Sequence, residues 1–243
     1  MTEQFENARE KIIHNLNESN KIGTLGEKTL HAVLKHTFEP DENSHEIKVG
    51  GFYADIVNEN GIFEIQTRNF YAMRKKLLYF LEACVVTIVY PVAETKWLVW
   101  IEPETGEIRS KRKSPKTGRG YEIFDELYRI KDMLLHPNLR FSIVFLDMVE
   151  YRILNGWSRD KKRGSTRENR VPKILNSILE INCTEDYKKL IPKNLPVPFS
   201  VKDLKKESRL HIKQAQTAVN VLKTIGVIKQ VGKQGNAFLY EIV

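Results

Sequence analysis

The stretch that most constrains the fold of this chain runs from Tyr53 to Gln66. It contains two short runs rich in β-branched and aromatic residues, and they flank Asn60-Gly61. Asn-Gly is the dipeptide that best fits a type I′ hairpin turn with two loop residues. The sequence therefore predicts a β-hairpin with Asn60 and Gly61 as the loop, in which Val57 pairs with Glu64 and Asp55 pairs with Gln66.

The predicted hairpin has one polar and one apolar face, because side chains alternate along a strand. The polar face carries Asp55, Val57, Glu64 and Gln66, and the face that can lie on a core carries Ala54, Ile56, Phe63 and Ile65. Asp55 and Glu64 would be diagonal neighbours about 7–8 Å apart, close enough to share a hard cation. The alternative is an ordinary solvated strand face. A slip of one residue would separate the two carboxylates.

A third acidic group lies upstream of the hairpin. Thr24 can cap a helix that reaches about Phe38, and Glu27 stands three residues later, in the capping-box position. Glu27 is thus either a capping side chain at the helix start or a third carboxylate over the hairpin. The two roles are compatible.

Composition narrows the class of protein. The chain has 243 residues, a net charge of +8 and a pI near 9.3, which favours an anionic partner such as nucleic acid. Cys84 and Cys183 are the only cysteines, too few for a disulfide framework or a cysteine zinc site, and a reducing cytoplasm fits. The six histidines are scattered without zinc-site spacing. No apolar signal region or membrane-length stretch occurs, so we expect a cytoplasmic protein with no membrane partner.

The remaining N-terminal elements indicate an α/β core with a mixed sheet over residues 1–155. We expect helices over residues 2–15, from Thr67 or Asn69 to Cys84, and over 121–135. We expect strands over residues 45–49, 85–91, 97–101 and 141–147.

Basic residues gather in three places and are candidates for phosphate contact, the alternative being a solvated surface. One is the first half of the helix after the hairpin, another is a predicted loop over residues 109–119, and the third is a basic linker over residues 156–170. The cations that we assign to nucleic-acid binding here are Arg68, Lys75, Lys111, Arg112, Lys113 and Lys116.

The C-terminal segment, residues 171–243, has the element order of a winged helix-turn-helix domain. A helix over 171–181 and a short one over 184–190 precede helices over 201–208 and 211–225, and strands over 227–231 and 237–242 follow. The helix over 211–225 would bury a stripe that begins at Ile212. Its exposed face would read DNA or contact phosphate through Lys213, Gln214, Gln216, Thr217, Asn220 and Lys223. Winged helices also serve as protein-binding modules.

Glu27 on a helix, Asp55 on one strand and Glu64-Ile-Gln66 on its partner resemble the PD-(D/E)XK, or restriction-endonuclease-like, nuclease superfamily. With the segment Arg112–Lys116 and the C-terminal winged helix, the pattern is also similar to an uncharacterised bacterial family. The resemblance implies that Asp55 and Glu64 hold Mg²⁺ (or Mn²⁺) and that Glu27 reaches the same ion. Gln66 departs from the motif, which normally has Lys there; Gln can orient a water but adds no charge. Arg68 or Lys75 would supply the missing positive charge.

These observations predict a metal-dependent endodeoxyribonuclease that acts on double-stranded DNA, for which a homodimer would suit cleavage of both strands. The alternative is a non-catalytic DNA-binding regulator on a nuclease-like scaffold. A third alternative is a protein-binding module within a larger complex.

Overall fold

The computed structural model describes residues 1–18, 29–156 and 164–243, and it has an α/β fold with a mixed sheet, as predicted. The chain forms two compact units. The first comprises residues 1–45, 92–118 and 144–177, and the second comprises 46–91, 119–143 and 178–243. Each unit therefore draws on chain from both sides of the basic stretch at 156–170. Three long strands contribute residues to both units: β4 (Val86–Ile101), β6 (Leu139–Ile153) and β7 (Thr166–Ile181).

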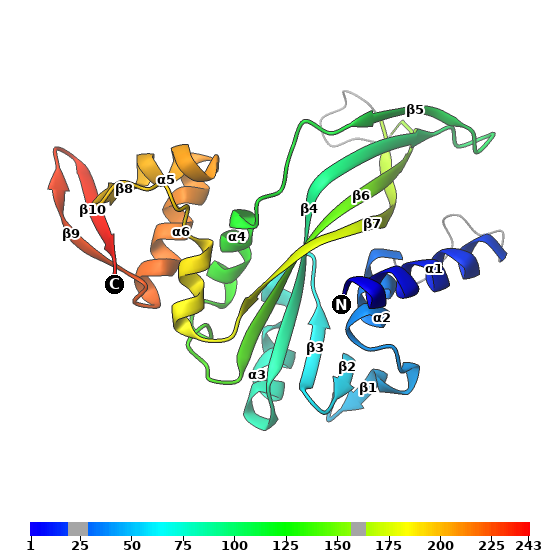
Figure 1. The fold of residues 1–243 in the computed structure, drawn as a ribbon, viewed down its shortest axis with the longest axis horizontal. Coiled ribbons are helices and arrows are strands. Elements are labelled where there is room, and N and C mark those ends of the chain that lie inside the picture. Colours follow the sequence, from blue (N-terminus) through cyan, green and yellow to red (C-terminus); the bar gives the residue numbers. More distant parts are fainter. Residues whose placement is uncertain (19–28, 157–163) are drawn as a thin grey trace. The chain divides into compact units, whose positions relative to one another are not determined.

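The larger sheet has the strand order β1-β2-β3-β4-β6-β7, with β5 paired to β4 (Figure 1). The other strands are β1 (His45–Val49), β2 (Phe52–Asn58), β3 (Gly61–Ile65) and β5 (Ile108–Lys113). β2 and β3 are antiparallel, β3 and β4 are parallel, and β5 runs antiparallel to β4. The sheet is therefore mixed.

In the second unit, the helix predicted after the hairpin is present as a 3-10 turn, η2 (Phe70–Met73), followed by α3 (Arg74–Ala83). Its predicted stripe is buried at Phe70, Met73, Leu77 and Leu81. The helix expected over 121–135 is wrong as one element. It is replaced by η3 (Tyr121–Ile123), α4 (Phe124–Leu127) and η4 (Tyr128–Ile130), each only one turn long.

The first unit contains α1 (Thr2–Glu18), α2 (Thr29–Phe38), all of β5 and parts of β4, β6 and β7. A buried carboxylate joins three of these strands. Glu150 is 1% exposed and forms ion pairs with Lys96, Arg152 and Arg170. Burial opposes ionisation of Glu150, but Lys96 and Arg152 hold its pKa below the ordinary value. The cluster is a charged network inside the first unit.

The C-terminal elements lie in the second unit and largely match the predicted order. They are η5 (Thr184–Leu190), β8 (Phe199–Ser200), α5 (Val201–Ser208), α6 (Ile212–Thr224), β9 (Ile228–Gln234) and β10 (Ala237–Ile242). Ser200 and Asp203 form a capping box at the start of α5, and Gly226 has φ +76° after α6. The three strands form a separate antiparallel sheet in the order β8-β10-β9 (Figure 1).

Three other predictions about elements were wrong. Residues 171–181 are part of β7, not a helix, although their apolar residues recur at helical spacing. Residues 108–113 form β5, so the predicted basic loop is half strand. The strands expected at 85–91 and 97–101 are one continuous β4. In each case pairing with a neighbouring strand of the sheet decided the conformation, and local propensity does not encode that pairing.

Candidate active site

The β2–β3 hairpin forms as predicted, but its register differs by two residues. Asn58 pairs with Gly61 and Ile56 pairs with Phe63, so the loop residues are Glu59 and Asn60. Neither has a positive φ, which excludes the predicted type I′ turn. Gly61 instead has φ +113°, and a Cβ there would lie 2.3 Å from the Val85 carbonyl oxygen. The glycine is therefore required by the close approach of β3 to the start of β4.

A shift of two residues leaves the faces of the strands unchanged, because side chains alternate with a period of two. Continuing the observed register places Asp55 directly opposite Glu64 on the same face, closer than the predicted diagonal arrangement. An Asp55 carboxylate oxygen, Oδ2, accepts a hydrogen bond from the Ile65 backbone N–H at 2.7 Å. The Asp55 side chain is thus held against β3, beside Glu64.

Glu64 is a buried carboxylate with only one oxygen satisfied. It is 5% exposed, and its Oε2 lies 2.6 Å from the Nζ of Lys76 on α3. Its Oε1 is buried without a hydrogen-bond partner. Burial and the Asp55 carboxylate raise the pKa of Glu64 to about 7, while Lys76 opposes that increase. A group with this pKa exchanges its proton near neutral pH and would bind a cation in its place.

The carboxylate pair fits a hard divalent cation. Mg²⁺ takes oxygen ligands, often only one or two carboxylates from the protein together with water or phosphate oxygens. Glu64 Oε1 is a free buried acceptor of that kind. Among the residues that the structure describes, no cluster of three or more His, Cys, Asp or Glu side chains could hold a metal ion. Glu27, the predicted third ligand, lies outside the described residues.

Lys76 is the site residue that the sequence interpretation missed. Arg68 and Lys75, which were expected to supply the positive charge, are both exposed, and neither forms the ion pair with Glu64. Lys76 lies three residues after Met73 and four before Phe80, so helical spacing places it on the buried side of α3. A lysine on the buried side of a helix was the sequence feature that could have identified Lys76 as a site residue. Gln66 follows β3 with its side chain half-buried, and its backbone N–H donates to Val89.

The predicted basic loop is an exposed edge strand in the first unit. All six residues of β5 are exposed, and Lys116 follows them at the surface. Arg109 pairs with Glu102 at 2.8 Å. Lys111 and Arg112 lie over the rings of Trp97 and Trp100, with 5.6 and 5.1 Å to the ring centroids.

The predicted recognition helix, α6, presents most of its expected polar face. Its exposed members are Lys213, Gln216, Asn220 and Lys223, and Thr217 is half-buried. Gln214 does not join this face, because its Nε2 donates to Asp125 of α4 at 2.7 Å. Ile212 was expected in the core but is 40% exposed. It borders a hollow of about 470 Å³ between the first turns of α5 and α6 and the β9–β10 hairpin, which Phe238 and Gln216 also line.

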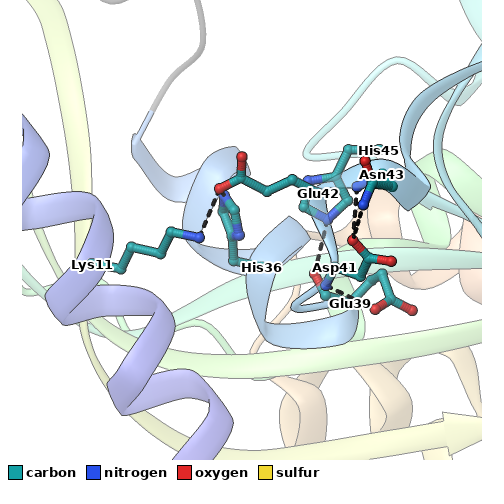
Figure 2. Close-up of polar contacts among 7 residues, drawn as sticks. All are labelled: Lys11, His36, Glu39, Asp41, Glu42, Asn43 and His45. Atoms are coloured by element: carbon teal, nitrogen blue, oxygen red, sulfur yellow. Dashed lines mark hydrogen bonds and ion pairs between the residues drawn. The ribbon is translucent and has the colours of Figure 1, made fainter.

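Two histidines from different elements, α2 and the start of β1, meet in the first unit. The rings of His36 and His45 have centroids 4.8 Å apart, and His36 lies 3.9 Å from Glu42, which Lys11 of α1 also contacts (Figure 2). Burial, followed by Lys11, lowers the pKa of His36. The charges of this cluster are matched internally, and we read it as a link between α1, α2 and the turn before β1.

No helix in the described part of the chain is both long and apolar enough to span a membrane. A family model described as "Domain of unknown function (DUF8091)" matches residues 28–182, which include the Asp55–Glu64 pair, Lys76 and β5. The chain is also similar to a protein of Treponema pallidum (strain Nichols) described as "Uncharacterized protein". The two are 28% identical over 228 residues, which cover 90% of this chain and 86% of the relative. No solved structure matches.

Proposed function

This chain belongs to the DUF8091 family, and we propose that it is a metal-dependent endodeoxyribonuclease whose C-terminal segment is a winged helix-turn-helix module. One observation carries the proposal. Asp55 and Glu64 face the same way on adjacent strands, and Glu64 combines burial, a raised pKa and an oxygen without a hydrogen-bond partner. Buried carboxylates in that state are typical of functional sites rather than of solvated strand faces.

Asp55 and Glu64 would hold Mg²⁺ or Mn²⁺, with Glu27 as the third acidic group that the sequence suggests. Such an ion, when bound, activates a water and offsets the charge that develops on a phosphate. The Ile65 N–H fixes Asp55 in place. Gln66 would orient the attacking water by hydrogen bonding, and Lys76 would supply the positive charge that the usual lysine of the motif provides.

The proposed DNA-binding role of the C-terminal segment rests on the order of α5, α6 and the β9–β10 hairpin. Lys213, Gln216, Asn220 and Lys223 are exposed on α6, and lysines and amides are the side chains that contact phosphates and base edges. The net charge of +8 supports a polyanionic partner. Double-stranded DNA is the expected substrate.

The test is incubation of the purified chain with supercoiled plasmid and Mg²⁺ or Mn²⁺. Asp55→Asn, Glu64→Gln and Lys76→Ala should each lower the cleavage rate by about 100-fold or more, because each removes a group at the proposed reaction centre. Glu82→Gln is the matched control, an exposed residue on the same helix, and should cleave like the parent chain. Linear rather than nicked product would indicate a homodimer that cuts both strands. Undiminished cleavage by Asp55→Asn and Glu64→Gln would refute the proposal.

A second candidate function is a DNA-binding regulator without catalysis. The observation that favours it is the Glu64–Lys76 ion pair, which can serve as a purely structural contact, together with Gln66 in place of the usual lysine. This role predicts DNA binding that weakens strongly between about 50 and 200 mM salt and is unchanged by Mg²⁺ or by Glu64→Gln. Cleavage that depends on Glu64 would exclude it.

A further inference from the structure

The edge of the sheet in the first unit carries a two-stranded ribbon formed by residues 97–101 of β4 and residues 108–113 of β5, here called the Trp97 ribbon (Figure 1). Trp97 is directly opposite Lys113, and Val99 is directly opposite Lys111. Since paired residues and residues two apart share a face, Trp97, Lys111 and Lys113 lie on one face of the ribbon. Arg112 lies on the other face, over Trp100.

Two features of this face are only partly accounted for within the first unit, where Lys111 lies over the Trp97 ring. No ion pair with a carboxylate occurs for Lys111 or Lys113 in the part of the chain that the structure describes, whereas Arg109 pairs with Glu102. Trp97 is 38% exposed beside them. Lysines on an edge strand discourage pairing with a second sheet, but that purpose does not call for an exposed indole.

We infer that the Trp97 ribbon binds single-stranded nucleic acid, with a base stacked on the Trp97 indole and phosphates paired with Lys111 and Lys113. The inference rests on the proposed role in nucleic-acid chemistry and adds a substrate feature to it, an unpaired strand. Aromatic rings flanked by cations are the usual means of binding unpaired strands, because every base has a face on which a ring can stack.

Single-stranded rather than double-stranded nucleic acid is the occupant that uses both features. In a duplex the faces of the bases are covered by their neighbours. A duplex would therefore contact the lysines through its phosphates and offer no base to stack on Trp97. An unpaired strand offers a base to Trp97 and phosphates to the lysines at the same time. Lys111, which lies over the indole with Nζ 5.6 Å from its centroid, has a flexible side chain that can move aside to a phosphate.

The test measures binding of a fluorescein-labelled oligothymidylate to the full chain by fluorescence anisotropy. The chain carries Asp55→Asn and the buffer contains EDTA, so cleavage plays no part. Trp97→Ala should weaken binding by about 5- to 150-fold, the range expected for loss of one stacked base, and Trp97→Phe should restore most of it. Binding of a duplex with the same sequence on one strand should change less than about twofold.

Tyr128→Ala is the matched control. Tyr128 is 43% exposed with the Nζ of Lys131 at 4.8 Å from its ring centroid, so it is a similar lysine–aromatic pair, but it lies on η4 rather than on the ribbon. It should bind oligothymidylate like the parent chain. Equal binding by Trp97→Ala and the parent would overturn the inference, as would equal weakening for single strand and duplex. If oligothymidylate binding depends on Trp97 but the parent chain does not cleave plasmid, the inference about the Trp97 ribbon stands and the proposed nuclease activity is refuted. If the parent chain cleaves plasmid but oligothymidylate binding does not depend on Trp97, the nuclease proposal stands and the inference about the ribbon is refuted.

Discussion

Glu64 is expected to make the stability of the fold depend on pH, and Glu64→Gln tests this directly. Burial and the neighbouring Asp55 raise the pKa of Glu64 to about 7 in the folded chain, against an ordinary value of 4.5. That difference corresponds to about 3 kcal/mol of folding free energy. The folded state holds the Glu64 proton more tightly than the unfolded state does. The stabilisation of the fold by this proton is therefore fully present below pH 4.5. It is lost as the pH rises through about 7.

Glutamine has nearly the same shape and carries no charge, so Glu64→Gln removes the cost of a buried carboxylate. At pH 8 the variant should be about 3 kcal/mol more stable than the parent, equivalent to a melting temperature roughly 6–12 °C higher. Near pH 4.5 the two chains should be equally stable. Thermal unfolding followed by circular dichroism in EDTA, across this pH range, measures the difference.

Glu82→Gln is the control for loss of one negative charge, because Glu82 is an exposed carboxylate on α3. It should show no pH-dependent difference of this size. Added Mg²⁺ should raise the melting temperature of the parent at pH 8 and leave Glu64→Gln unchanged. If Glu64→Gln is less stable than the parent at pH 8, or if the difference is the same at every pH, the description of Glu64 as a buried group with a raised pKa is wrong.

Five further variants test other parts of the structure. Lys76→Met removes the ammonium that lowers the pKa of Glu64, so protons should compete more strongly with Mg²⁺ for this carboxylate. Mg²⁺ affinity at neutral pH, measured by calorimetry, should fall about tenfold for each unit by which the pKa of Glu64 rises. Gly61→Ala should cost about 2 kcal/mol or more in urea denaturation, because its Cβ would meet a backbone oxygen at 2.3 Å and φ is +113°. Ser200→Ala removes the cap of α5 and should cost about 1 kcal/mol in thermal unfolding. Gln214→Ala should cost about 1 kcal/mol of stability by loss of its hydrogen bond to Asp125, yet leave duplex binding unchanged in anisotropy. Lys213→Ala should weaken duplex binding and make it less dependent on salt, because one phosphate contact is lost.

The faces of the hairpin were predictable from sequence although its turn was not. Alternation has a period of two, so an error of two residues in register still places Asp55 and Glu64 together. The turn itself was misassigned because Gly61 is needed for the approach of Val85, a contact that the local sequence does not reveal. Likewise, the capping residues of α5 and the glycine after α6 are local signals and predicted those helices well.

The sequence by itself determined which residues carry charge, which faces alternate and where capped helices begin. Only the tertiary structure decided that residues 171–181 extend a strand, that Lys76 pairs with Glu64, and that Trp97 and Lys113 lie opposite each other. The physical reason is range. Periodicity and capping act over a few residues, whereas strand pairing and ion pairing join segments distant along the chain, and their energies outweigh local preference.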